Sequence, residues 1–356
     1  MDMRIGYTDG ASFVPFKHYT DIAQFVTEPV KSRSTDNKMP IRGFSYGYLA
    51  NRSELRSPAG IRSQAALFSL GLNWICLSVV NYQSTYSSTD LHPDYYTTPT
   101  DWDIAAFAEH ARQHGLKVCL KPMVNPSDGL WRAHISFPDL QTNDMDKYWE
   151  EWFESYTHFI LHYAALAREL NFEMLCIGCE MIGTEHRSKN WLKLIEEVRA
   201  IYPGKLIYST NHDREDVYAW FDELDYVGIS AYYAVGANGS TKEDMIKAWT
   251  EIKYKLDAIA EMRNKQFLFT EIGCRSATGC AATPYDYADE GEWNEDEQAN
   301  FYESCLEVFK DDKKFAGAFW WDWPTFTYET REEAEKDVSF NIHLKKAEEV
   351  IKKYYK

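Results

Sequence analysis

The chain has 356 residues, of which 45% are hydrophobic, and it carries a formal net charge of −17. A chain of this length and apolar content can bury a large core, and α/β barrels commonly use this much sequence for a single domain. The strong negative charge argues against nucleic acid and against an anionic membrane surface as partners, since both are polyanions. It favours a neutral ligand.

Targeting signals and cysteines give further limits. No apolar run is long enough to cross a bilayer, and the start of the chain has no apolar signal core. We therefore expect a cytoplasmic protein, or a secreted one whose leader is absent from this sequence. Cys176 and Cys179 have C-x-x-C spacing, but positions three apart on a strand face opposite sides, so we expect no redox or zinc site there. Cys274 and Cys280 flank a glycine-containing loop, and the sequence leaves their pairing open.

Residues 1–40 show no clear period and are predicted to form an N-terminal lead-in segment, whereas strand-like and helix-like runs alternate over 41–356. The first four strand–helix pairs are predicted, in chain order, at Ile41–Tyr46 and Ala59–Leu70, Asn73–Val80 and Asp101–His114, Lys117–Val124 and Asp144–Leu170, and Met174–Cys179 and Ser188–Ile201. The second four are predicted at Leu206–Thr210 and Glu215–Phe221, Tyr226–Ser230 and Thr241–Met262, Phe267–Thr270 and Glu295–Phe309, and Ala316–Trp321 and Ile342–Tyr355.

These eight β/α units define the predicted fold. Each strand run is almost entirely apolar, as expected of a parallel sheet that is covered on both faces. Helix signals support the boundaries: Asp101 is placed to cap the helix that follows it, and Gly115 is placed to end that helix. The sequence therefore predicts an α/β protein with a single (β/α)8 TIM barrel over residues 41–356.

Two of the predicted strands have the same form, an apolar run that delivers a glutamate at its C-terminal end. Glu180 follows the fourth strand and Glu271 ends the seventh. Burying a carboxylate costs free energy unless it has partners or a function. The C-terminal ends of barrel strands build the active face of this fold, and two carboxylates on one face are what a retaining glycosidase requires. The alternative is a structural carboxylate paired with Lys121 or Arg132.

The other strand ends add polar and aromatic side chains to the same rim, and Trp and Tyr suit stacking on the apolar faces of sugar rings. The candidate substrate-binding residues are Ser45, Tyr46, Asn81, Lys121, Trp131, Arg132, Asn211, His212, Tyr232, Tyr233, Trp293, Trp320 and Trp321. Alternation sends only one of the last two inward, and the sequence does not say which. The rim supplies one histidine, His212, so neither a metal nor another cofactor is predicted.

Glutamates that end the fourth and seventh strands resemble those of the clan A glycoside hydrolases. Within that clan the chain is similar to glycoside hydrolase family 113, whose members are mainly β-1,4-mannanases. The similarity covers roughly residue 41 to the end. The motifs that carry it are Gly43-Phe44-Ser45-Tyr46, Leu120-Lys121-Pro122, Trp131-Arg132, Gly178-Cys179-Glu180, Gly228-Ile229-Ser230-Ala231-Tyr232-Tyr233, Phe269-Thr270-Glu271-Ile272-Gly273 and Phe319-Trp320-Trp321.

The resemblance implies a cofactor-free enzyme with a neutral β-linked oligo- or polysaccharide as substrate. Glu271 would be its nucleophile and Glu180 its general acid/base, with the carboxyl groups about 5–5.5 Å apart. Tyr232 is expected to hydrogen-bond Glu271. Much of the clan has Asn immediately before the acid/base, where this chain has Cys179, so the contact to the 2-hydroxyl of the sugar is expected from Asn211 or His212.

Two alternatives remain open at this point. One is a clan A β-glycosidase with another specificity, for glucan or xylan oligosaccharides. The other is an inactive carbohydrate-binding barrel, although both glutamates are present. The sequence separates neither endo from exo action nor a monomer from an oligomer.

Overall fold

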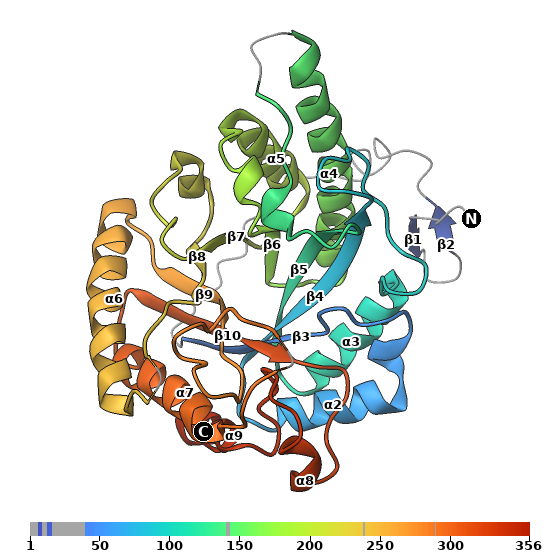
Figure 1. The fold of residues 1–356 in the computed structure, drawn as a ribbon. Coiled ribbons are helices and arrows are strands. Elements are labelled where there is room, and N and C mark those ends of the chain that lie inside the picture. Colours follow the sequence, from blue (N-terminus) through green and yellow to red (C-terminus); the bar gives the residue numbers. More distant parts are fainter. Residues whose placement is uncertain (1–5, 9–12, 16–39, 140–142, 238, 289) are drawn as a thin grey trace.

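The computed structural model describes residues 6–8, 13–15, 40–139, 143–237, 239–288 and 290–356. Eight parallel strands close into a barrel in the order β3-β4-β5-β6-β7-β8-β9-β10, and β10 pairs with β3 (Figure 1). The predicted (β/α)8 barrel is confirmed. The strands are β3 Ile41–Tyr46, β4 Trp74–Gln83, β5 Lys117–Pro126, β6 Met174–Cys179, β7 Lys205–Asn211, β8 Val227–Ser230, β9 Phe267–Ile272 and β10 Phe315–Trp323.

Helices surround the barrel on its outer side (Figure 1). They are α2 Pro58–Phe68, α3 Asp101–Gln113, α4 Asn143–Glu169, α5 Ser188–Ile201, α6 Lys242–Arg263, α7 Glu295–Phe309, α8 Arg331–Ala334 and α9 Lys346–Tyr355. Short 3-10 turns are η1 Glu54–Arg56, η2 Arg132–His134, η3 Ile182–Thr184 and η4 Ala219–Glu223. Among the described residues, no helix is both long and apolar enough to cross a membrane.

Several predicted boundaries differ from the structure, and three of these differences have a clear local cause. The helix predicted over 215–221 is the 3-10 turn η4, which starts later because the Glu215 carboxylate accepts from the Asp213 backbone N–H and holds a loop there. The last helix begins at Lys346 rather than Ile342, since Leu344 has a left-handed φ of 58° that a helix cannot contain. Thr100 rather than Asp101 caps α3, in a capping box with Asp103.

The N-terminal lead-in is described only in part. β1 Gly6–Thr8 and β2 Phe13–Pro15 form a two-stranded antiparallel sheet. The rest of the predicted lead-in, up to residue 39, lies outside the described residues.

The interior of the barrel is layered. An apolar cluster fills its lower half, where the strands begin: Ile41, Trp74, Cys76, Cys119, Met174, Cys176, Ile207, Tyr226, Leu268, Ala316 and Phe319. Above it lie polar side chains, among them Lys121 and Glu271, both of which are almost completely buried. The residues that alternate with these inward positions pack outward against the helices in a larger core. The polar layer therefore lies at the C-terminal end of the strands, where this fold places its active sites.

Candidate active site

Irregular strand pairing turns both glutamate-bearing segments toward the barrel interior. On β6, Cys176 pairs with Ile207 and Cys179 with Ser209, so three steps along β6 match two along β7. The extra residue breaks the alternation of side chains. Cys176 and Cys179 consequently both face inward, in separate clusters. The expectation that they face opposite sides is wrong.

β9 has a similar irregularity beside β8. Ile229 pairs with Phe269, and the next residue, Ser230, pairs with Glu271, so Thr270 is the extra residue. Thr270 shares a hydrogen bond with Ser209 inside the barrel, and Glu271 also points inward, although adjacent strand positions normally alternate. The bulge therefore places the Glu271 carboxylate in the polar layer.

Glu180 lies just beyond β6 with a left-handed φ of 55°, which side chains of L-residues rarely adopt. Its backbone N–H donates to the Ser209 carbonyl over 2.8 Å, which fixes this turn. A residue held in such a conformation costs about 1 kcal/mol or more, and strain of this kind clusters at functional sites. Two residues earlier, a side chain at Gly178 would lie within 3 Å of the Tyr208 and Trp191 rings, so only glycine fits there.

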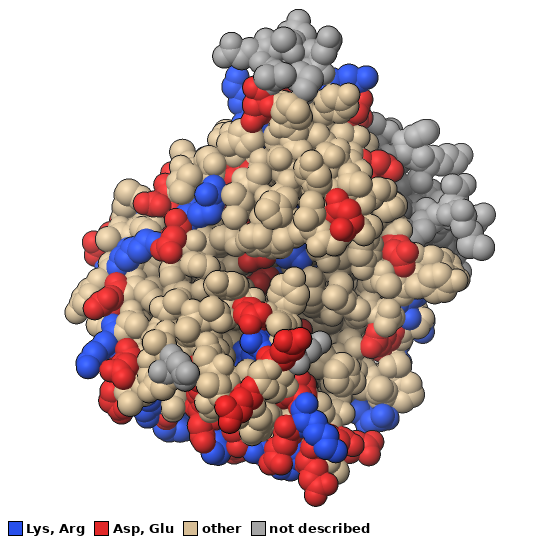
Figure 2. All heavy atoms as spheres, in the orientation of Figure 1, with Lys and Arg blue, Asp and Glu red and all other residues tan. Residues whose placement is uncertain are grey.

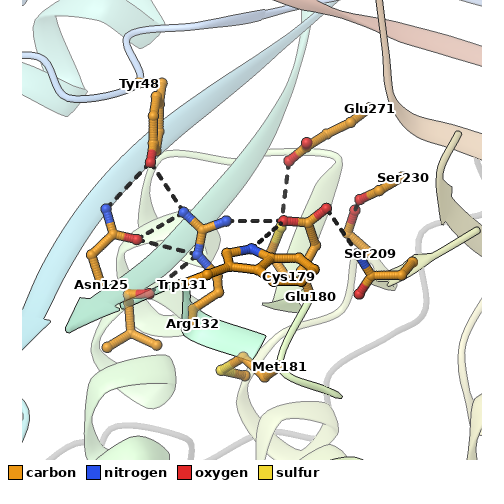
Figure 3. A network of polar contacts seen from close by, with 12 residues as sticks. Tyr48, Asn125, Trp131, Arg132, Cys179, Glu180, Met181, Ser209, Ser230 and Glu271 are labelled. Carbon is orange, nitrogen blue, oxygen red and sulfur yellow. Dashed lines mark hydrogen bonds and ion pairs between the residues drawn. The ribbon is translucent and has the colours of Figure 1, made fainter. Parts of the chain in front are cut away.

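Three donors surround the Glu180 carboxylate (Figure 3). Arg132 Nη1 donates to Oε2 over 3.1 Å, and Trp131 Nε1 to the same oxygen over 3.3 Å. Asn211 Nδ2 donates to Oε1 over 3.3 Å. Burial, and then the charge of Glu271, raise the pKa of Glu180, while Arg132 acts in the opposite direction. A raised pKa lets this carboxyl carry a proton at the start of a reaction.

Arg132 is itself held in place. Its Nη2 donates to Asn125 Oδ1 over 2.7 Å and to the Tyr48 hydroxyl over 3.1 Å, and Asn125 also donates to that hydroxyl (Figure 3). Asn125 lies at the strand end where the sequence places polar rim residues, whereas nothing in the sequence indicates Tyr48 as a site residue. Tyr48 lies two residues beyond the end of β3, in a loop, where strand patterning gives no signal.

Glu271 has a different set of partners. Lys121 Nζ forms an ion pair with Oε1, and Cys179 Sγ donates to the same oxygen over 3.4 Å. The Tyr232 hydroxyl donates to Oε2 over 3.0 Å, as predicted. Burial and the neighbouring carboxylates raise the pKa of Tyr232 well above its usual value, so the phenol keeps the proton that it donates. These donors all stabilise the ionised form of Glu271.

Lys121 keeps its charge although it is fully buried. Burial alone would lower its pKa, but the acidic groups around it, Cys179 and Glu271, raise that pKa well above the usual value. The structure thus pairs one cation with each glutamate, Lys121 with Glu271 and Arg132 with Glu180.

Trp321, and not Trp320, faces the glutamates. Its ring lies 4.8 Å from the Tyr48 ring and 5.5 Å from Lys121 Nζ, and it is partly exposed. Trp320 is fully buried on the outer side, stacked on Tyr302 at 4.0 Å, with Nε1 donating to the Tyr355 hydroxyl. The prediction of Trp320 as a substrate-binding residue is therefore corrected.

Three other predicted ligands point away from the glutamates: Tyr46 and Asn81 because their strand positions alternate outward, and Tyr233 because it lies beyond the end of β8. Tyr46 is fully buried and stacks on Phe107 of α3. Asn81 accepts a hydrogen bond from Tyr163 of α4. Tyr233 bonds Glu215 and packs against the core, so none of the three reaches the glutamates.

In the described part of the chain, none of the remaining candidates forms a hydrogen bond with either glutamate. Ser45 is fully buried, and His212 lies beside the ring of Tyr233. Trp293 lies 5.3 Å from Lys345 Nζ and 5.8 Å from the Arg331 guanidinium, away from the glutamates' own partners. The structure brings together Lys121, Trp131, Arg132, Asn211, Tyr232 and Trp321 around Glu180 and Glu271, and we call this group the carboxylate site.

Acidic and basic side chains lie recessed near the middle of one face of the molecule, ringed by other residue types (Figure 2). Within the described ranges, no three His, Cys, Asp or Glu side chains gather in a way that would hold a metal ion. The seven cysteines are free, although the sulfur atoms of Cys274 and Cys280 lie 3.0 Å apart.

Comparison with known proteins identifies this arrangement. The model of glycoside hydrolase family 113 matches residues 44–345. The chain belongs to glycoside hydrolase family 113. As a member of family 113 it is a glycoside hydrolase, and its carboxylate site holds the two glutamates that such chemistry requires.

Solved structures of family 113 proteins are similar to this chain over nearly its whole length. The family 113 β-mannanase from Alicyclobacillus acidocaldarius, in complex with ManMIm, has 35% identity and a TM-score of 0.81, covering 89% of this chain and 97% of its own. A complex of a family 113 β-1,4-mannanase has 32% identity and a TM-score of 0.82, covering 89% and 98%.

More distant structures share the fold alone. A family 5 subfamily 18 protein from Streptomyces cattleya, in complex with Manb1-4GlcNAc, has 12% identity and a TM-score of 0.57, covering 88% of this chain and 80% of its own. Among proteins with curated functional descriptions, none matches this family 113 chain.

Proposed function

We propose that this family 113 chain is a retaining β-1,4-mannanase that acts on neutral mannan or manno-oligosaccharides by double displacement. The observation that carries the proposal is the contrast between two buried glutamates of one site. Glu180 has a raised pKa, and Glu271 is paired with a buried cation. The specificity for mannose rests on the 35% identity to a β-mannanase over most of both chains.

In the first step, protonated Glu180 gives its proton to the glycosidic oxygen while a Glu271 carboxylate oxygen attacks the anomeric carbon. The bond between that carbon and the leaving oxygen breaks, and a glycosyl ester with Glu271 forms. As its ester forms, Glu271 loses negative charge while Glu180 gains it. Arg132 Nη1 and Trp131 Nε1 both donate to Glu180 Oε2 and stabilise the ionised form that this step leaves behind.

In the second step, Glu180 takes a proton from water, and the water oxygen bonds to the anomeric carbon from the face that the leaving group occupied. The Glu271 ester bond breaks, and the configuration is retained. The donors Lys121 and Tyr232, already in place, stabilise the released carboxylate without reorganisation.

Two features fit a sugar ring between the glutamates. The partly exposed Trp321 ring offers an apolar platform beside Lys121. The Asn211 amide donates to Glu180, and its buried oxygen has no hydrogen-bond partner in the described part of the chain. That oxygen is available to a hydroxyl group at C2 of the sugar, the contact that Cys179 cannot supply in place of an amide.

The proposal is tested by product analysis with β-1,4-linked manno-, gluco- and xylo-hexaoses, alongside Glu271→Ala. We expect cleavage of the manno-series, abolished by the substitution, and the product lengths distinguish endo from exo action. Cleavage of a different series keeps the mechanism and removes the mannose specificity. If no series is cut by the unmodified protein, or if Glu271→Ala retains full activity, the proposal is wrong.

A further inference from the structure

Asp322 lies on the same rim as the two glutamates, and the mechanism above gives it no role. It follows Trp321 near the C-terminal end of β10, and it precedes Trp323, which is fully buried and donates to Ser63 Oγ. Asp322 is partly exposed. Its two neighbours in the strand point to different sides: Trp321 faces the carboxylate site, and Trp323 packs in the outer core.

β9 and β10 approach each other closely at this end of the barrel. Gly273 lies two residues after Glu271, and a Cβ atom there would lie 2.3 Å from the Trp321 carbonyl oxygen. Only glycine permits this approach of the two backbones. The approach brings the Asp322 carboxylate close enough to Glu271 for the two charges to interact.

The Asp322 carboxylate has almost no donors. In the part of the chain that the structure describes, its own backbone N–H is the only group that donates to it, and no cation pairs with it. Glu180 and Glu271 each have three side-chain donors. Buried polar groups are nearly always hydrogen-bonded, so a recessed carboxylate without partners at a substrate site has acceptor capacity for a ligand.

The groups around Asp322 are neutral or acidic. The carboxylates of Glu271 on β9 and of Asp337 in the segment before α9 repel a negative charge on Asp322. A charge on Asp322 in turn disfavours ionisation of the phenols of Tyr232, after β8, and Tyr302, on α7. Burial first, and then Glu271 and Asp337, raise the pKa of Asp322 to about 7. Apart from its own backbone N–H, the described part of the chain supplies no donor that stabilises the charged form of this carboxylate.

We propose that Asp322 is a substrate-binding residue that accepts hydrogen bonds from hydroxyl groups of the sugar bonded to Glu271 or of its neighbour on the non-reducing side. This inference rests on the proposed function and extends it. A sugar that stacks on Trp321 with its anomeric carbon at Glu271 directs hydroxyl groups outward from the ring edge, and Asp322 is the next residue along the strand. A carboxylate offers two oxygens with about four acceptor positions, which suits adjacent hydroxyl groups.

The first test is Asp322→Asn, which keeps the size of the side chain and removes its charge. At pH 8, kcat/KM for β-1,4-mannohexaose should fall roughly ten- to a hundredfold, the range for hydrogen bonds to a charged group. The same change at Asp311, an exposed residue before the N-terminal end of β10, is the matched control and should have no effect. An Asp322→Asn enzyme with unchanged kcat/KM overturns the proposal. If that variant does not fold, as judged by its unfolding temperature, Asp322→Ser replaces it.

A pH series separates binding by the charge from a structural role. The ratio of kcat/KM between the unmodified enzyme and Asp322→Asn should be small below pH 6, where Asp322 is largely protonated. It should grow as the pH rises through about 7. A ratio that is constant over this range overturns the proposal, because the lost charge would then not be what binds the sugar.

Aryl β-mannobiosides that each lack one hydroxyl group test whether the effect of Asp322→Asn is coupled to the loss of one particular hydroxyl group. Removing the hydroxyl that Asp322 binds should cost the unmodified enzyme about tenfold or more in kcat/KM, and Asp322→Asn almost nothing. If no deoxy substrate shows this coupling, the proposal is wrong. If the unmodified enzyme does not cut mannohexaose at all, the proposed mannanase function has failed instead, and the same ratios are measured on the hexaose that it does cut.

Discussion

The surroundings of Glu180 and of Glu271 differ in origin as well as in chemistry. The donors to Glu271 come from the barrel wall: Lys121 from β5, Cys179 from β6 and Tyr232 from the residues directly after β8. Two of the three donors to Glu180, Trp131 and Arg132, belong to the loop after β5 and its short turn η2. The carboxylate that is paired with a lysine is thus held by strands and the residues next to them.

The carboxylate with the raised pKa receives two of its three donors from a loop, and burial is the main cause of that raised pKa. One side-chain type thus takes two catalytic roles through its environment alone.

The largest effect is expected from removing each carboxylate in turn. Glu271→Ala should lower kcat by at least about a thousandfold, because the nucleophile is lost. With an aryl β-mannoside and added azide, this variant should release an α-mannosyl azide, since azide occupies the space of the carboxylate. Glu180→Ala should instead give the β-mannosyl azide, formed from the glycosyl ester. NMR of the products distinguishes the two anomers. A β-azide from Glu271→Ala and an α-azide from Glu180→Ala would mean that the two glutamates have the opposite roles.

A loss of stability of about 3–5 kcal/mol is expected for Lys121→Met, because it leaves Glu271 buried without its cation. The double variant Lys121→Met/Glu271→Gln should recover most of this loss. Denaturant unfolding measures both. The control is Lys147→Met, since Lys147 pairs with Glu151 at the exposed surface and should contribute less than about 1 kcal/mol. Equal losses for the two lysine variants would contradict the strand-held ion pair.

The two adjacent tryptophans should separate binding from stability. Trp321→Ala should lower kcat/KM about tenfold or more, with a small change in unfolding free energy, because its partly exposed ring is the sugar platform. Trp320→Ala should remove about 3–5 kcal/mol of stability by leaving a cavity in the core, with kcat nearly unchanged in the folded enzyme. The reverse pattern would mean that Trp320 faces the carboxylate site and Trp321 packs in the core.

The smallest effect concerns the loop around Glu180. Trp131→Phe removes a donor that lowers the pKa of Glu180, so that pKa should rise. Because the protonated form of Glu180 starts the reaction, activity is lost as the pH rises through this pKa. The alkaline limb of the kcat/KM profile should therefore move to higher pH, and further for Arg132→Met. A shift to lower pH would contradict the assignment of Glu180 as the acid.

The sequence is sufficient for the barrel and for the two glutamates, because long apolar runs and strand ends are local signals. It fails where the direction of a side chain depends on strand pairing. Tyr46 and Asn81 end apolar runs but point outward. In a strand that is apolar on both faces, the sequence does not show which alternate side chains face the barrel interior. For the same reason the sequence leaves open which of Trp320 and Trp321 faces inward.

The bulge at Thr270 is a second feature that the sequence alone does not predict. Strict alternation from Leu268, which faces the barrel interior, would send Glu271 outward. Glu271 points inward only because β9 has one extra residue, Thr270, where it pairs with β8. The sequence shows Cys179 as a departure from the clan, but the contact of Cys179 with Glu271 depends on the corresponding irregularity in β6. No local pattern in the chain predicts either insertion.

The ion pair between Lys121 and Glu271 also has a consequence for how the enzyme assembles. β5 and β9 are four strands apart in either direction around the closed sheet, so the pair spans the lumen between opposite walls. The two residues are 150 positions apart in the chain, so forming their contact closes a long loop at a cost in chain entropy. A half-barrel made of β3 to β6 would contain the acid and the lysine, and one made of β7 to β10 the nucleophile. Neither half contains both glutamates, so the complete carboxylate pair exists only when the ring closes.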